Sequence, residues 1–406
     1  MFNIVKIKQD FPFFSNNPDL VYLDNSATTL KPQIVINGVS TYYTKFSTNP
    51  SSLDFKLSYD CWQHIQKTRT LVAKFINGHK DEVIFIPSST YGLNSLAWGI
   101  KSLITKNDEI LITQAEHNSN LLPWLELAKQ KEAHVKFIAL DNFKITVENT
   151  VKSLTPQTKV VSFASITNVL SAINDVKAIC QAIKAYNPNI IVIIDAAQSV
   201  AFVPINVVDW GIDFLVFSAH KMLGPTGIGV LWGKKHLLEQ LDSFVIGGGS
   251  NVIVDENQQY HWTNKINQLE AGTLNVAGIF GLYEAIKYLQ TIGIKNIASY
   301  ISKLKEYAIK RIKEENLDVT IYNAHTKTGV LIFNVNNVAA HDVSAFLANQ
   351  YQICLRSGQH CSPLIKNIIN VKATLRASFY FYNTKEDVEK LIQALKVGGD
   401  FVGDIL

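Results

Sequence analysis

Short apolar strands alternate with amphipathic helices through the middle of this chain, and this alternation restricts the fold more than any other feature of the sequence. Strands separated by helices are typical of a mainly parallel sheet that is covered by helices. Ligands of such sheets bind at the carboxyl ends of the strands. Asp195, His117 and Asn168 each follow a strand, so we expect all three at that edge. The expected strands are 108–113, 135–138, 158–163 and 190–194, and the expected helices are 121–131, 146–154 and 176–186.

An acid and a lysine in this region indicate a specific cofactor. Asp195 ends the run Ile190-Ile191-Val192-Ile193-Ile194, and Lys221 follows 26 positions later in the run Ser218-Ala219-His220-Lys221. Pyridoxal 5'-phosphate (PLP) uses such a pair, because the lysine forms a Schiff base and the carboxylate keeps the pyridine nitrogen protonated. A lysine between Ser and Gly residues is ordinarily a solvated loop residue. Its pairing with Asp195-Ala196-Ala197-Gln198 favours PLP binding.

Six short motifs carry a resemblance to a known family. The chain resembles the aminotransferase class V branch of the PLP enzymes and, within it, the group II (selenocysteine lyase-like) cysteine desulfurases. The resemblance covers nearly the whole chain. It implies the PLP-dependent transferase fold type I, an α/β fold with a mainly parallel seven-stranded sheet in a large domain and a smaller α+β C-terminal domain. The motifs are Tyr22-Leu23-Asp24-Asn25-Ser26-Ala27-Thr28-Thr29, Ala115-Glu116-His117-Asn118-Ser119-Asn120, Thr167-Asn168-Val169-Leu170-Ser171, Glu270-Ala271-Gly272-Thr273, Arg356-Ser357-Gly358-Gln359-His360-Cys361 and Tyr382-Asn383-Thr384-Lys385-Glu386-Asp387-Val388.

The length of 406 residues accommodates two domains. We expect an N-terminal segment at 1–19 that packs on the small domain and a large PLP-binding domain at 20–280. A small C-terminal domain at 281–406 is expected to carry the catalytic cysteine loop. The sequence pattern changes after about residue 275, where longer helical patterns begin.

The resemblance also implies roles for individual residues. The hydroxyl run Ser88-Ser89-Thr90 precedes a helical segment, where it would cap the helix, hold a phosphate, or do both. In the family this position has a Gly-Thr-Thr pattern and binds the cofactor phosphate. The implied phosphate contacts are Ser89, Thr90, Ser218 and His220, with Thr273 reaching the phosphate from the partner subunit. The other implied roles are stacking and proton transfer for His117, cofactor contacts for Gln198 and Asn168, and substrate binding for Asn168, Arg356 and Arg376.

Cys361 separates desulfuration from other PLP chemistry. The chain has four cysteines and no C-x-x-C pair, which argues against a disulfide framework and against a zinc site. Cys361 lies in a polar loop with Arg356 and His360, whose charges favour a reactive thiolate. Its Arg-x-Gly-x-x-Cys spacing is the group II form. One departure concerns Ser51-Ser52-Leu53, which stands where group II members usually have His-Arg-Gly, and its effect on the active-site entrance stays open.

We therefore expect a homodimeric cysteine desulfurase with Lys221, Cys361 and His117 as catalytic residues. It would convert L-cysteine to L-alanine and pass the sulfur, as a Cys361 persulfide, to an acceptor protein for iron–sulfur cluster assembly. The alternatives are a selenocysteine lyase, a class V aminotransferase that has no use for Cys361, and a catalytically silent sulfur-transfer scaffold. Intact Lys221 and Asp195 argue against the scaffold.

The charge and hydropathy patterns of the sequence restrict the kinds of partner and the cellular location that we expect. The net charge of +4 is mild, and no Lys/Arg run indicates nucleic-acid binding. No apolar run reaches the roughly 20 residues of a membrane span. Residues 1–10 carry charges where a signal peptide has an apolar core, so we expect a cytoplasmic protein.

Overall fold

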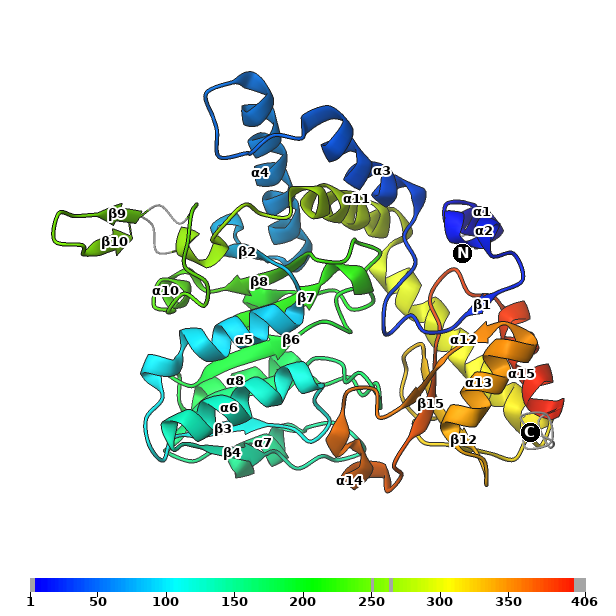
Figure 1. Cartoon of the computed structure of the whole chain (residues 1–406). Helices are drawn as coiled ribbons and strands as arrows, with labels where there is room; N and C mark the ends of the chain where they lie inside the picture. The colour runs from blue at the N-terminus through cyan, green and yellow to red at the C-terminus, as the bar shows by residue number, and fades with distance from the viewer. Residues whose placement is uncertain (1–3, 250–251, 263–265, 398–406) are drawn as a thin grey trace.

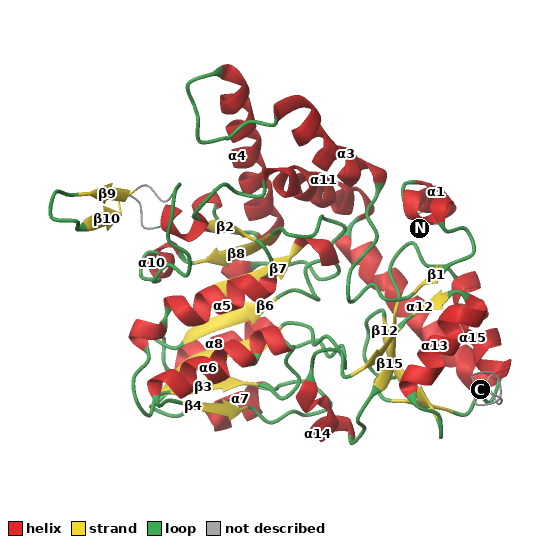
Figure 2. Cartoon of the chain, viewed as in Figure 1, coloured by secondary structure: helices red, strands yellow, loops and turns green. Residues whose placement is uncertain are grey.

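A seven-stranded sheet forms the centre of the larger part of the computed structural model, which describes residues 4–249, 252–262 and 266–397 (Figures 1 and 2). Only β8 runs antiparallel to its neighbours β7 and β2, and the other pairs of adjacent strands are parallel. The expected mainly parallel seven-stranded sheet is therefore confirmed. In spatial order the strands are β2 (Val83–Ile86), β8 (Gly229–Gly233), β7 (Phe214–Ser218), β6 (Ile191–Asp195), β5 (Thr158–Ala164), β3 (Glu109–Ile112) and β4 (His134–Phe137).

Helices cover both faces of this sheet because its strands are apolar on both sides. In β2, Val83 and Phe85 belong to one buried cluster, whereas Ile84 and Ile86 belong to another. This period of two follows from the alternating direction of side chains along a strand. One face packs against α5 (Ser89–Gly99) and α6 (Leu122–Lys131). The other packs against α4 (Lys56–Ile76), α8 (Val176–Tyr186) and α11 (Val276–Ile292).

A smaller antiparallel sheet lies beside the large one (Figure 1). Its strands in spatial order are β11 (Val319–Ile321), β12 (Val330–Val335), β15 (Thr374–Ser378) and β14 (Arg356–Gly358). It packs with α12 (Ile294–Glu314), α13 (Ala340–Tyr351) and α15 (Lys385–Val397) around its own core. β1 (Val21–Tyr22) pairs in parallel with β13 (Ile353–Cys354) and so ties the N-terminal region to this part.

The expected domain boundary at residue 280 falls inside α11, whose residues all along its length belong to the large core. Along α12 the packing changes, since Ile297 and Ile301 join the large core and Leu304 joins the small one. The N-terminal α1 (Ile4–Gln9) contacts α15 through Lys8 and Asp387, whose charged atoms are 3.4 Å apart. The division into segments 1–19, 20–280 and 281–406 remains a proposal, and its ends at 1–3 and 398–406 lie outside the described residues.

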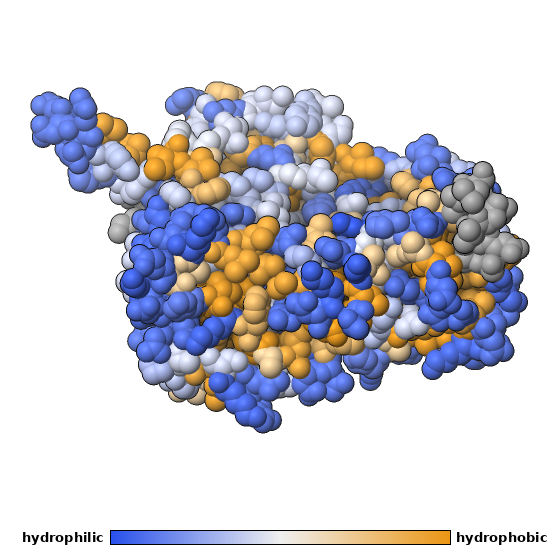
Figure 3. Space-filling view, turned by 60° about the horizontal axis from the view of Figure 1, so that its bottom comes forward, coloured by the Kyte–Doolittle hydropathy of each residue, from blue (hydrophilic) through white to orange (hydrophobic). Residues whose placement is uncertain are grey.

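A two-stranded hairpin projects from the body of the molecule (Figure 1), and Figure 3 shows the projection from another side with hydrophilic atoms at its tip. Its strands are β9 (Val252–Val254) and β10 (Tyr260–Trp262). Four of their apolar or aromatic side chains are exposed: Val252, Ile253, Val254 and Tyr260.

The remaining α-helices are α2 (Pro12–Asn16), α3 (Gln33–Thr41), α7 (Val147–Ser153), α9 (Val207–Trp210), α10 (Lys235–Leu238) and α14 (Lys366–Ile369). Within the described part of the chain, no helix combines the length and the apolar character needed to cross a membrane.

Candidate active site

A cavity of about 200 Å³ lies at the carboxyl ends of β5, β6 and β7 and is lined on its other side by residues of the small sheet. This is the edge at which open α/β sheets bind ligands. Nearly all the residues expected to bind cofactor or substrate meet here, although they come from distant parts of the chain. They are Ser89, Thr90, His117, Asn168, Asp195, Gln198, Ser218, His220, Lys221, Arg356 and Arg376.

Lys221 and Asp195 stand at the ends of neighbouring parallel strands. Asp195 is the last residue of β6, and its Oδ1 accepts a hydrogen bond of 2.9 Å from the Ala197 N–H. Lys221 ends a short 3-10 turn that follows β7. Burial lowers the pKa of Lys221 to about 8, and the Asp195 carboxylate acts in the opposite direction. An amine with this pKa is partly unprotonated near neutrality, which covalent chemistry with an aldehyde requires.

The carbonyl of His220, directly before Lys221, is fixed by residues of the N-terminal motif. It accepts hydrogen bonds from the Thr29 N–H at 3.0 Å, from Thr28 Oγ1 at 3.1 Å and from Lys31 Nζ at 3.2 Å. Burial lowers the pKa of Lys31 to about 8. These contacts hold the turn that presents Lys221. They could not be predicted from local sequence, because they join segments about 190 residues apart.

Hydroxyl groups gather where α5 begins. Ser88 is the N-cap of α5 and accepts a hydrogen bond of 3.2 Å from the Tyr91 N–H. The Ser89 N–H donates to Ser218 Oγ at 2.7 Å, and the two side-chain oxygens are 2.9 Å apart. Hydroxyl donors at a helix N-terminus fit an anionic group such as a phosphate. Of the alternatives left open by the sequence, capping is present at Ser88, and the adjacent hydroxyls of Ser89 and Thr90 line the cavity.

His117 lies in the loop between β3 and α6, held by the buried Glu116. The Glu116 carboxylate accepts hydrogen bonds from Thr113 Oγ1 at 2.7 Å, from Asn120 Nδ2 at 2.8 Å and from the Ala164 N–H at 3.0 Å. Glu116 thereby joins this loop to the end of β5. Burial, together with the positive charges of Lys221 and two arginines, lowers the pKa of His117 to about 4. The imidazole is therefore neutral at physiological pH.

The Cys361 loop is backbone-strained and firmly held. His360 and Cys361 both have left-handed backbone conformations, with φ of 54° and 59°, which are unfavourable for residues other than glycine. Asn168 Nδ2 donates to the His360 carbonyl at 2.8 Å, and Asn168 Oδ1 accepts from Ser362 Oγ at 2.8 Å. The Asn118 N–H donates to the Cys361 carbonyl at 2.8 Å. The side chain of Asn168 thus forms hydrogen bonds to the residues on both sides of the cysteine.

Two arginines that line the cavity contact this loop or the residue that holds it. Arg356 Nη2 donates to Cys361 Sγ at 3.2 Å, and Cys361 is thereby joined to the cavity through Arg356, although it is not itself a lining residue. Arg376 is buried, with Nη2 on Asp24 Oδ1 at 3.0 Å and Nη1 on the Asn168 carbonyl at 3.1 Å. Its Nε is buried without a hydrogen-bond partner among the described residues. Sequence motifs predicted both arginines but not the contacts to Cys361 and Asp24.

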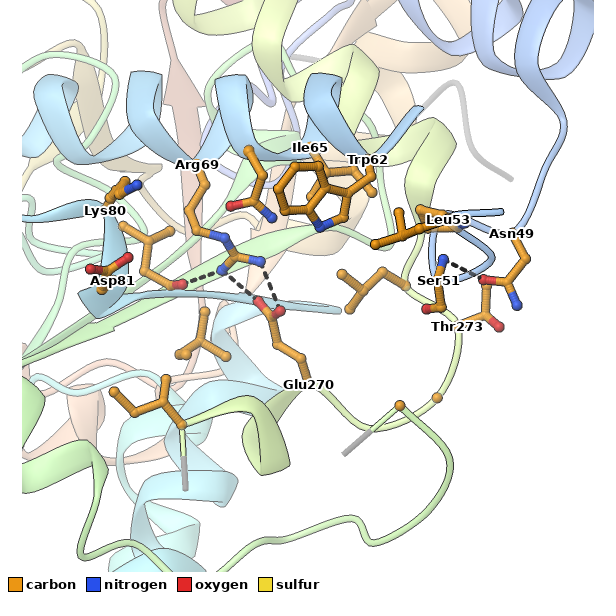
Figure 4. Close-up of a pocket in the computed structure, with 18 of the residues that line it drawn as sticks. Asn49, Ser51, Leu53, Trp62, Ile65, Arg69, Lys80, Asp81, Glu270 and Thr273 are labelled. Carbon is orange, nitrogen blue, oxygen red and sulfur yellow. Dashed lines mark hydrogen bonds and ion pairs between the residues drawn. The ribbon is translucent and has the colours of Figure 1, made fainter. Parts of the chain in front are cut away.

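Thr273 is the expected cofactor-binding residue that the chain does not bring to this cavity. It lines a separate cavity of about 810 Å³, which Figure 4 shows beside the bidentate ion pair of Arg69 and Glu270. Ser51 and Leu53, from the segment that departs from the usual His-Arg-Gly, line the same cavity. Thr273 and this segment therefore line one cavity that is separate from the chain's own Lys221 cavity.

A sequence profile described as Aminotransferase class-V matches residues 21–391. The chain belongs to this family. It is similar to probable cysteine desulfurases from Ureaplasma parvum (39% identity over 389 residues, 96% of each chain) and from Borreliella burgdorferi (37% identity, 97% of this chain and 96% of the relative). This class V protein is a PLP-dependent enzyme of the cysteine desulfurase type.

Solved structures agree with this assignment. The apo structure of a cysteine desulfurase from Thermococcus onnurineus has a TM-score of 0.91 and 31% identity, and it covers 98% of both chains. The structure of the cysteine desulfurase CsdA from Escherichia coli has a TM-score of 0.90 and 30% identity, with 98% of this chain and 99% of that chain covered. The match to CsdA supports the group II resemblance found in the sequence.

Proposed function

We propose that this class V enzyme removes sulfur from L-cysteine, releases L-alanine and carries the sulfur as a persulfide on Cys361. One observation supports the proposal most strongly. A cysteine thiol lies 3.2 Å from Arg356, and this arginine lines the same cavity as Lys221 and Asp195. An aminotransferase has no use for a thiol at that position. We propose further that the reaction takes place in the cytoplasm and that the persulfide sulfur passes to an acceptor protein that serves iron–sulfur cluster assembly.

Bound PLP would supply an electron sink for the carbon atoms of the substrate. Lys221 would hold the cofactor covalently and then, as a free amine, move the proton of the substrate Cα. Cys361 Sγ, as a thiolate beside Arg356, would attack the substrate sulfur, so that an S–S bond forms while the Cβ–S bond breaks. The bonding electrons stay with Cβ, which takes up a proton to complete alanine. The sum is L-cysteine and a Cys361 thiol giving L-alanine and a Cys361 persulfide.

The other cavity residues would bind and orient the cofactor and the substrate. We propose that Asp195 pairs with the pyridine nitrogen and that His117 lies against the ring. Gln198 would donate to the phenolic oxygen with the second hydrogen of Nε2, since the first is donated to the Ser26 carbonyl at 2.9 Å. Ser89, Thr90, Ser218 and His220 would contact the phosphate. The substrate carboxylate would be bound by Arg356, Arg376 and Asn168, all three of which line the cavity.

We also propose that the active form is a homodimer in which Thr273 completes the phosphate site of the partner subunit. The open 810 Å³ cavity that Thr273 lines and the exposed apolar β9–β10 hairpin support this proposal, because an isolated two-stranded hairpin is only marginally stable in water. An active monomer in analytical ultracentrifugation would contradict it.

The reaction is tested by incubating the protein with L-cysteine, PLP and a thiol reductant and measuring alanine and sulfide together. We expect the two products in equal amounts. Cys361→Ser should lose nearly all sulfide release while still binding PLP, because a serine hydroxyl stays protonated near neutrality and attacks sulfur poorly. Cys354→Ser, at a half-buried thiol in β13, is the matched control and should keep full activity. Full activity of Cys361→Ser would refute the proposed role and favour the lyase.

A further inference from the structure

Ser119 lies beside the imidazole of His117 and makes two contacts to the same nitrogen. The Ser119 N–H donates to His117 Nδ1 at 3.1 Å, and Ser119 Oγ lies 3.0 Å from the same atom. Ser119 is buried, and both residues line the cavity. Among the expected site residues Ser119 does not appear, since no feature of its local sequence distinguishes it from an ordinary turn serine.

The contact from the backbone decides the position of the imidazole proton. A backbone N–H can only donate, so Nδ1 of His117 must be the unprotonated, accepting nitrogen. The hydroxyl of Ser119 then also points its hydrogen at Nδ1 and shares the nitrogen lone pair with the backbone N–H, because the opposite orientation would set an oxygen lone pair against that lone pair at 3.0 Å. The neutral imidazole therefore carries its proton on Nε2, which is the nitrogen left for the cavity.

The hydroxyl of Ser119 is oriented in turn by Thr90. Their side-chain oxygens are 2.7 Å apart. Because the hydrogen of Ser119 Oγ is used on His117, Thr90 Oγ1 must be the donor in this contact. A directed chain of hydroxyl hydrogens thus runs from Thr90, at the start of α5, through Ser119 to His117. Thr90 is one of the hydroxyls that line the anion-binding end of the cavity.

We propose that Ser119 is a positioning residue that holds His117 in the Nε2–H tautomer and links it to the Thr90 hydroxyl. His117 would then enter each reaction cycle as a hydrogen-bond donor at Nε2, which leaves the role of base to Lys221. The proposal concerns the same site as the proposed function, but the test below reads the imidazole directly and does not depend on turnover.

The test is ¹⁵N NMR of the histidine-labelled protein without added substrate, with the His117 signal assigned by its loss in His117→Gln. We expect the wild-type signals of a neutral imidazole protonated only on Nε2. In Ser119→Ala the backbone bond remains, so the tautomer is kept. The pKa of His117 should rise by about half to one pH unit, because one donor to the neutral form is lost. Lys221, Arg356 and Arg376, the charged groups that face His117, are unchanged in this variant.

Four further proteins make the result specific. Ser119→Thr keeps the hydroxyl and should restore the wild-type pKa of His117. Thr90→Val should raise this pKa in the wild-type background but not in the Ser119→Ala background, because Thr90 acts only through Ser119. Ser153→Ala, which removes a hydroxyl bonded to a helix carbonyl in α7, should have no effect. A proton on Nδ1 in the wild type, or an unchanged pKa in Ser119→Ala, would overturn the proposal.

Discussion

Asn168→Ala should loosen the Cys361 loop without unfolding the protein. The change removes the 2.8 Å bonds to the His360 carbonyl and from Ser362 Oγ, both of which belong to buried residues. Losing two such bonds and leaving two buried polar groups without partners costs about 2–4 kcal/mol. The left-handed backbone of His360 and Cys361 adds to the tendency of the loop to open. If the whole loss of free energy destabilises the closed state of the loop, the population of its open state rises about 30- to 1,000-fold.

Amide hydrogen exchange measured by mass spectrometry on peptides that cover residues 358–363 reads this population directly. The amide of Asn118 is a second probe, because its acceptor is the Cys361 carbonyl. Asn174→Ala is the matched control, since Asn174 is also buried and bonds to the Ala164 carbonyl at 2.7 Å and the Ile145 N–H at 3.0 Å. The control should lower the global free energy of unfolding by a similar amount but leave the loop protected. Equal exchange of the loop in the two variants would refute the argument that Asn168 holds it.

The remaining predictions concern the lysine, its acid partner and the buried ion pair. PLP capture by the apo protein, followed by absorbance, should accelerate as pH rises through about 8, because only the neutral amine of Lys221 attacks an aldehyde. Asp195→Asn should shift this profile to lower pH, since the carboxylate is what raises the pKa of Lys221 against the effect of burial; a shift to higher pH would contradict the assignment. Glu270→Ala should lower the free energy of unfolding in urea by about 3–5 kcal/mol, because it leaves Arg69 charged and nearly buried without its partner. Asp60→Ala, at an exposed pair with Lys56, should change it by less than about 1 kcal/mol.

The sequence was sufficient to predict the parallel strands and the strand-end residues of the site. β3, β4, β5 and β6 lie within a residue or two of their expected positions, because apolar runs and helical spacing are local signals. The reversed direction of β8 could not be predicted, since an apolar run is the same in either direction. The sequence pattern changes after about residue 275, and the packing passes from the large core to the small one along α12.

Within the site, residue types were predictable and contacts were not. Lys221, Asp195 and Cys361 stand in short motifs whose chemistry is recognisable in the sequence. The hydrogen bonds from Asn168 to His360 and Ser362 join residues that are 192 and 194 positions apart. No local pattern encodes such contacts. The same holds for the bond between Arg376 and Asp24, which are 352 positions apart. The role of Ser119 could not be predicted for a different reason. Its contact to His117 is local, but a serine in a turn is too common to indicate a function.

The bond between the Asn118 N–H and the Cys361 carbonyl joins the two halves of the molecule at the cysteine itself. Even fully extended, the five residues from Gly358 to Ser362 reach only about 15 Å. With both ends of this stretch in contact with fixed neighbours, the thiol has little freedom to travel. Delivery of the sulfur would then depend on how well an acceptor can reach the thiol, because the loop cannot carry the thiol to a distant acceptor. If the sulfur passes to an acceptor protein, as proposed above, that protein would have to bring its own nucleophile to the mouth of the cavity. The shape of the mouth would then determine which acceptor proteins can reach the thiol.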